Sequence, residues 1–124
     1  MDYVNKAEVC GRLTRDPEMR YTPRGTAVCN VSIATNRFAN APDGERREFT
    51  EYFTLVAWQG LASQVAALCK ADWLHVKGRI QSRSWQGQDG QKRRVTEIIV
   101  EEILSAEGRT APAAAAALDE DFNP

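Results

Sequence analysis

The sequence predicts an all-β fold, a barrel of five strands with one short helix between the third and fourth strands. The chain has 124 residues, of which 43% are hydrophobic and 27% charged, a composition typical of one globular domain. Several segments alternate apolar and polar residues with a period of two, and turn sequences rich in Pro, Gly and Asn separate them. Residues 61–70 instead place apolar residues three and four positions apart, as an amphipathic helix requires.

The first two strands are expected to be neighbours in the sheet. Residues 4–13 are rich in apolar side chains, and Asp16-Pro17 follows them. The sequence Pro23-Arg-Gly25 has the residues that a tight turn requires. Residues 26–36 then alternate, which predicts a half-buried strand with the inward residues Cys29, Val31 and Ile33.

The third strand is expected over residues 49–58, after an exposed connection. Residues 38–48 combine Asn-Ala-Pro-Asp-Gly with a run of charges, which predicts a loop or hairpin tip that becomes ordered on binding. In the strand that follows, alternation places Tyr52 and Trp58 on one face and Leu55 on the other. The helix over residues 61–70 ends near Lys70.

The fourth strand, residues 73–85, separates two kinds of side chain. Alternation sends Leu74, Val76, Gly78 and Ile80 inward. The opposite face receives cations and indoles together, namely Trp73, His75, Lys77, Arg79, Gln81, Arg83 and Trp85. Large aromatic rings are costly to expose without a partner, whereas single-stranded nucleic acid uses rings for its bases and cations for its phosphates.

The last strand completes the pattern of an OB-fold barrel. Gly87–Gly90 is a hairpin turn, and residues 92–104 are rich in Val and Ile. Five strands with this helix placement fit an OB-fold, which binds oligonucleotides on one sheet face. After residue 104 the composition changes, so we expect an OB-fold domain at residues 1–104 and a flexible acidic tail at residues 105–124. The net charge of −1 combines a slightly basic domain with this acidic tail.

Other classes of protein are not favoured by the sequence. No apolar run is long enough to span a bilayer and the N-terminus lacks a signal sequence, so a cytoplasmic protein is expected. Binding to DNA would make it nucleoid-associated. Three cysteines without a Cys-x-x-Cys pair indicate neither disulfides nor zinc, and all three are expected to be small buried residues. With a single histidine, His75, and no nucleophile motif, we expect no enzyme, no cofactor and no metal.

An ordered series of motifs resembles the bacterial single-stranded DNA-binding protein family over about residues 4–104. The resemblance implies an OB-fold that usually assembles as a homotetramer and coats single-stranded DNA in replication, recombination and repair. The motifs that carry it are Val4–Lys6, Gly11–Pro17, Arg20–Pro23, Gly25–Val28, Thr50–Tyr52, Val56–Trp58, Gly78–Arg83, Gly90–Gln91 and Val95–Glu97.

The resemblance also implies which residues bind DNA. Aromatic residues stand where the family stacks bases, at Phe38, Tyr52, Trp58 and Trp85. Basic residues on matching or adjacent surfaces would contact phosphates, namely Lys6, Arg37, Lys77, Arg79 and Arg83. The acidic tip would dock replication and repair proteins through Asp119, Glu120, Asp121 and Phe122, although the chain ends at Pro124 where the family has a terminal Phe. The alternative is an acidic end that only increases solubility.

Other residues on the same surfaces are left out of the predicted set of main DNA contacts. Trp73 matches no aromatic position of the family, so packing against a loop or another subunit is expected. His75 is expected to be solvated. The basic pairs and triplets near the turns, Arg46-Arg47 and Lys92-Arg-Arg94, are solvated turn charges or weak phosphate contacts.

Two other functions remain open from the sequence. A stacking groove accepts either sugar, so the chain is alternatively an RNA-binding OB module. In the second alternative, the outward face with its aromatic side chains contacts another protein, which would make the chain an OB-fold adaptor in a primosome or replisome.

Overall fold

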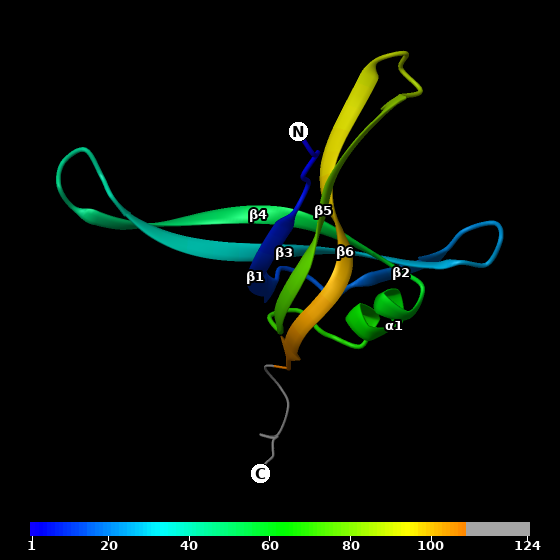
Figure 1. Cartoon of the computed structure of the whole chain (residues 1–124), viewed down its shortest axis with the longest axis horizontal. Helices are drawn as coiled ribbons and strands as arrows, with labels where there is room; N and C mark the ends of the chain where they lie inside the picture. The colour runs from blue at the N-terminus through cyan, green and yellow to red at the C-terminus, as the bar shows by residue number, and fades with distance from the viewer. Residues whose placement is uncertain (109–124) are drawn as a thin grey trace, which may run out of the picture.

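The computed structural model describes residues 1–108 and confirms the predicted barrel. Its strands form one sheet in the order β1-β5-β6-β4-β3-β2, and β1 also pairs with β3. That extra pairing closes five strands into a barrel, with β2 on the outside of β3 (Figure 1). The elements are β1 Ala7–Leu13, β2 Glu18–Tyr21, β3 Ala27–Asn40, β4 Arg46–Trp58, α1 Gly60–Ala66, β5 Trp73–Gln86 and β6 Lys92–Glu107.

The core fills the barrel with small and β-branched side chains. Alternate residues of β3, β4 and β5 are fully buried, and α1 adds Ala62 and Val65 to the same cluster. Burying each large aliphatic side chain stabilises the fold by about 1.5–3 kcal/mol. The largest fully buried side chains on the strands are Val31, Ile33, Leu55, Leu74 and Val76.

Two glycines allow the strands to approach closely where the barrel closes. A Cβ on Gly11 of β1 would lie 2.2 Å from the carbonyl oxygen of Ala34. A Cβ on Gly78 of β5 would lie 1.9 Å from the carbonyl oxygen of Ile99, next to a shift in the β5–β6 register. Any larger residue at either position would therefore push two strands apart.

Two long hairpins extend beyond the barrel as arms (Figure 1). We call residues 36–50 the β3–β4 arm and residues 82–96 the β5–β6 arm. The β3–β4 ladder continues to Asn40 opposite Arg46, so the loop predicted over residues 38–48 is wrong for all but the turn at its tip. The arm is a paired hairpin because its strands keep their backbone hydrogen bonds even where neither face meets a core.

Several element boundaries differ from the prediction. The first strand begins at Ala7 instead of Val4, and β2 is an additional short strand. The helix ends at Ala66, four residues before Lys70. The last strand continues past residue 104 to Glu107, where β6 still pairs with Trp73.

Three predictions about single residues are wrong. Ile80 is 47% exposed because β5 has left the barrel at that point and no core lies beneath it. Cys10 and Cys69 are exposed, and only Cys29 is buried, which raises the pKa of its thiol. His75 is not simply solvated, since its Nε2 lies 2.7 Å from Oε2 of Glu8 on β1.

The predicted tail residues Asp119, Glu120, Asp121 and Phe122 lie outside the described residues. Within residues 1–108, no helix is long and apolar enough to cross a membrane.

Candidate nucleic-acid interface

The outward face of β4 presents two aromatic rings, as its alternation predicts. Tyr52 is 68% exposed and Trp58 is 42% exposed, whereas Leu55 and Ala57 between them are buried in the core. A strand in a closed barrel sends successive side chains to opposite sides, so both rings point away from the core. We call this outward side of β4, with the neighbouring parts of β5 and β6, the aromatic face.

Two shallow grooves run along the aromatic face and meet at Glu97. One has a volume of about 270 Å³ and is lined by Val28, Asn30, Val56, Trp58, Gln81, Arg83, Glu97 and Ile99. The other has a volume of about 320 Å³ and is lined by Tyr52, Phe53, Thr54, Ile80, Thr96, Glu97 and Ile98. Each ring of β4 therefore borders a mostly apolar groove, and the two grooves share Glu97 in their lining.

The β3–β4 arm carries a third exposed ring on the same side as Tyr52. Residues paired across antiparallel strands point to the same face. Since Ala34 pairs with Tyr52 and Phe38 lies four residues further along β3, Phe38 shares the face of Tyr52. The guanidinium carbon of Arg46 lies 5.2 Å from the ring centre of Phe38.

Arg37 lies on the other face of this arm, with a ring that the sequence did not single out. Its guanidinium carbon is 4.8 Å from the ring centre of Phe49, and its Nε is 3.5 Å from Oε2 of Glu51. The side chains of Arg37 and Phe38 therefore point to opposite faces of the arm, although the two residues are adjacent in sequence. A phosphate contact from Arg37 requires DNA to reach round the edge of the arm.

The β5–β6 arm carries the fourth ring, Trp85, near its tip. Trp85 lines a hollow of about 310 Å³ at the turn, together with Lys92. The guanidinium carbon of Arg83 lies 5.2 Å from the Trp85 ring centre, and Arg83 also lines the groove beside Trp58. Arg83 thus lies between the groove of the barrel and the ring of the arm.

Two other predicted cations, Lys6 and Lys77, line a hollow that also contains carboxylates, which we call the mixed hollow. Lys6 and Lys77 line a hollow of about 560 Å³ together with Glu8, Glu101 and Glu102. This hollow lies at Lys77 and Gly78 in the barrel part of β5, whereas Trp85 lies near the tip of the arm. The carboxylates lower its positive potential, so its attraction for a polyanion is weaker than the lysines alone suggest.

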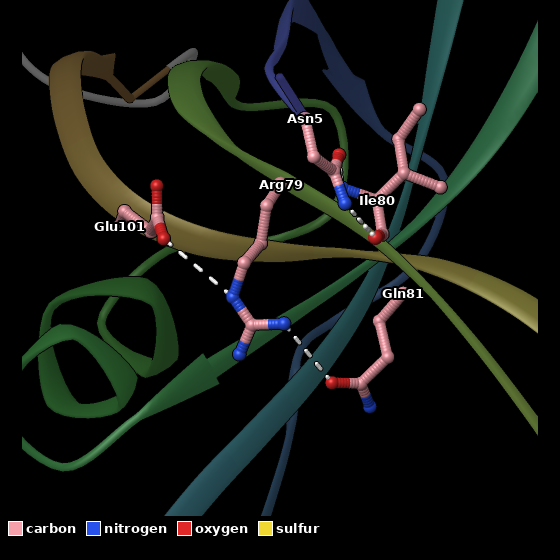
Figure 2. A network of polar contacts seen from close by, with 5 residues as sticks. All are labelled: Asn5, Arg79, Ile80, Gln81 and Glu101. Atoms are coloured by element: carbon pink, nitrogen blue, oxygen red, sulfur yellow. Dashed lines mark hydrogen bonds and ion pairs between the residues drawn. The ribbon is translucent and has the colours of Figure 1, made fainter. Parts of the chain in front are cut away.

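Arg79 lies between Glu101, which lines this hollow, and Gln81, which lines the Trp58 groove (Figure 2). Its Nε lies 3.5 Å from Oε2 of Glu101, and its Nη1 donates to Oε1 of Gln81 at 3.2 Å. Beside it, the amide of Asn5 donates to the carbonyl of Ile80 at 2.7 Å and accepts from its N–H at 2.8 Å. These two hydrogen bonds hold the N-terminal segment against β5, because the Asn5 side chain pairs with the backbone of Ile80 as a residue of a neighbouring strand would.

Three of the five predicted phosphate contacts already have a carboxylate partner. The pairs of Arg37 and Arg79 join exposed side chains, and such pairs stabilise a protein by about 0–1 kcal/mol, so a phosphate can displace them. Arg83 differs because its partner Glu97 is buried. The hydrogen bonds that Arg83 donates to Glu97, and then the negative charge of Glu97, raise the pKa of the Arg83 guanidinium.

Sequence reasoning missed Glu97 and Phe49. The signal for Glu97 was the register of the hairpin, because the turn at Gly87–Gly90 places Gln81 opposite Glu97, with Arg83 two residues away. Trp73, for which the sequence predicts packing against a loop or another subunit, is partly exposed. The guanidinium carbon of Arg12 lies 4.3 Å from its ring centre. Among residues 1–108, no cluster of His, Cys, Asp and Glu could hold a metal ion.

Comparison with known proteins decides the family. The profile of the single-strand binding protein family matches residues 4–105. The chain belongs to this family. The resemblance predicted from the motifs is thereby confirmed.

Relatives with this family's name cover most of the chain. The single-stranded DNA-binding protein of Neisseria meningitidis serogroup A is 39% identical over 120 residues, which are 96% of this chain and 69% of that protein. That of Bacillus cereus is 42% identical over 108 residues, 86% of this chain and 62% of that protein. The chain thus spans roughly two thirds of the length of these relatives.

Solved structures of the family have the same fold. A Plasmodium falciparum SSB in complex with ssDNA superposes with a TM-score of 0.75 at 26% identity, covering 82% of this chain and 90% of that one. A deletion mutant of the single-stranded DNA-binding protein from Thermus aquaticus gives a TM-score of 0.75 at 28% identity, covering 87% and 52%.

Proposed function

We propose that this chain binds single-stranded DNA without sequence preference and coats it during replication, recombination and repair, without catalysing a reaction. The observation that carries this proposal is the pair of exposed rings, Tyr52 and Trp58, bordering joined grooves on one face of the barrel. The names of the relatives and the ssDNA complex of a structural neighbour support the same ligand.

Base stacking supplies the affinity in this proposal. Bases stack on Phe38, Tyr52, Trp58 and Trp85, and each stacked base contributes about 1–3 kcal/mol. Stacking does not read sequence, because every base has a π-face. A duplex hides those faces inside its own stack, so the same surface selects single strands.

Basic side chains supply the contacts to the backbone. The residues assigned to phosphates are Lys6, Arg37, Lys77, Arg79 and Arg83. Each phosphate neutralised releases counterions, so binding weakens as salt rises. Arg83 is the best placed of the five, because it lines the Trp58 groove and also approaches Trp85.

The active form in this proposal is a homotetramer. Large apolar side chains at Val4 and Leu104 are exposed on the single chain, and exposed apolar groups favour burial against another copy. Light scattering at micromolar concentration should give the mass of four chains. In such a tetramer one DNA strand wraps around several barrels. A monomeric protein would contradict this arrangement.

We assign the binding function to residues 1–104 and recruitment of replication and repair proteins to residues 105–124. The acidic residues Asp119, Glu120 and Asp121 with Phe122 offer a charged segment and an aromatic anchor to such a partner. Removing residues 109–124 should leave oligonucleotide binding intact and abolish capture of partners.

Intrinsic tryptophan fluorescence during titration with oligo-dT tests the proposed ligand. Strong quenching by the single strand, weaker at high salt and absent with a duplex of equal length, supports stacked indoles. Tighter binding of oligo-U than of oligo-dT would favour the RNA-binding module. Absence of binding to both would favour the protein adaptor.

A further inference from the structure

A buried carboxylate lies at the centre of the aromatic face. The Glu97 side chain on β6 is only 7% exposed, and it lines both the Tyr52 groove and the Trp58 groove. A buried charge is costly unless it is paired and hydrogen-bonded. A negative charge is also unfavourable by itself on a surface that binds a polyanion, so its position at this point needs a physical reason.

Glu97 holds the guanidinium of Arg83 through two hydrogen bonds. Nε of Arg83 donates to Oε1 at 3.0 Å, and Nη2 donates to Oε2 at 3.4 Å. The Arg83 side chain itself is 54% exposed. One edge of the planar group is therefore fixed to the floor of the groove while the rest of it faces solvent.

The pairing leaves Arg83 with donors for a second acceptor. A guanidinium has five N–H donors in a rigid fork, and Glu97 uses two of them. Its carbon lies 5.2 Å from the Trp85 ring centre, so the free donors lie between the ring of the arm and the groove beside Trp58. A guanidinium fork matches two oxygens of one phosphate.

We infer that Glu97 is a positioning residue for DNA binding: its buried carboxylate orients Arg83 so that the free guanidinium edge receives one phosphate between Trp58 and Trp85. Orienting the side chain before binding removes the entropic cost of ordering it on the DNA. This inference rests on the proposed function, because it describes how the same surface contacts the backbone.

The variant Glu97→Gln separates positioning from charge. Coulomb attraction alone predicts that removing a negative charge strengthens binding to DNA. Positioning predicts the reverse, because the neutral amide cannot hold both donors of Arg83. We expect Glu97→Gln to bind oligo-dT about tenfold more weakly than the unchanged chain, as the loss of a pre-oriented contact would give. Equal or tighter binding by the folded variant would overturn the inference.

A double-mutant cycle tests whether Glu97 acts through Arg83. Arg83→Met should weaken binding, and adding Glu97→Gln to it should cause no further loss. An equal additional loss in the Arg83→Met background would overturn the inference, because Glu97 would then act independently. The matched control is Asp89→Asn, which breaks an exposed pair with Arg93 at 2.8 Å on the same arm and should leave affinity unchanged.

The type of oligonucleotide distinguishes a phosphate contact from a base contact. Equal losses on oligo-dT and oligo-dC support a phosphate fork. A loss confined to oligo-dC would overturn it, since carboxylates accept hydrogen bonds from the cytosine amino group and thymine has none.

A further variant tests the fork geometry of Arg83 without changing Glu97, and it serves if Glu97→Gln fails to fold. Arg83→Lys keeps the charge but lacks the planar fork, so we expect it to bind as weakly as Arg83→Met. Binding by Arg83→Lys at the strength of the unchanged chain would overturn the inference. Failure of the unchanged chain to bind any single strand would instead reject the proposed function itself.

Discussion

At the scale of single residues, the neighbours of each ring separate the rings proposed for DNA from Trp73. Tyr52 and Trp58 border grooves on the barrel, whereas Trp73 lies at the start of β5 under Arg12. All three rings are exposed, so exposure alone does not assign a role. The neighbours of each ring do.

Replacing Trp58 and Trp85 together by Ala should weaken oligo-dT binding by two or more orders of magnitude, because each stacked base contributes about 1–3 kcal/mol. Both side chains are partly exposed, so circular dichroism and the melting temperature should change little. Trp73→Phe is the matched control, since it alters a tryptophan of similar exposure outside the grooves. Unchanged affinity of the double variant would reject these two residues as stacking sites.

Gly78 allows β5 and β6 to pack closely, which a larger residue would prevent. An added methyl group would meet the carbonyl oxygen of Ile99 at 1.9 Å, and backbone cannot move aside as a side chain can. Gly78→Ala should destabilise the protein by about 2–4 kcal/mol through this overpacking, measured by urea unfolding. Gly60→Ala is the control, because open space surrounds that position. Equal stability of the two variants would mean that the strands separate without cost.

At the scale of elements, the sequence predicted the parts of the chain that have a core on one side. Alternation identified β3, β4 and β5 because Ile33, Leu55 and Leu74 point into the barrel. It failed for residues 38–48, because both faces of a projecting hairpin meet solvent and neither requires apolar residues. It failed for Ile80 for the same reason, since the alternation continues where the core has ended.

The aromatic site was predicted better than its polar contacts. Parity along one strand placed Tyr52 and Trp58 together, and the motifs indicated Phe38 and Trp85 as further rings. The Arg83–Glu97 pair depends on the register between β5 and β6, which alternation in a single strand does not determine. Alternation alone places Arg37 and Phe38 on opposite faces, but the contact of Arg37 with Phe49 depends on cross-strand pairing in the same way.

Shortening the β3–β4 arm should separate folding from binding. Replacing residues 37–49 by Asn-Gly leaves Asn36 and Thr50 flanking a two-residue turn, and these residues already share a side-chain hydrogen bond of 2.9 Å. The core residues remain, so we expect the barrel to fold. Oligo-dT affinity should fall at least as far as in Phe38→Ala, because Arg46 is lost as well. Affinity equal to that of the full chain would show that DNA does not reach this arm.

At the scale of the whole molecule, the distribution of charge matters more than the net charge of −1. Cations follow β5 from the mixed hollow at Lys77 to Arg83 in the Trp58 groove, with Arg79 between them. Carboxylates accompany this row along its length, at Glu101 and Glu97. The row therefore provides a path for a phosphate backbone with only a modest electrostatic field, and stacking must supply most of the affinity.

The salt dependence of binding measures how much of this row contacts DNA. If all five assigned cations of one chain met phosphates of an oligonucleotide short enough to occupy a single barrel, the logarithm of the binding constant would fall with the logarithm of salt with a slope of about −3.5, because single strands give about −0.7 per phosphate. Lys77→Gln should reduce the magnitude of the slope by about 0.7. Arg20→Gln on β2 is the control, since this exposed cation pairs with Glu18 and lies in no groove of the aromatic face. An unchanged slope for Lys77→Gln would place the mixed hollow off the DNA path and restrict the backbone contacts to the Arg83 end of β5.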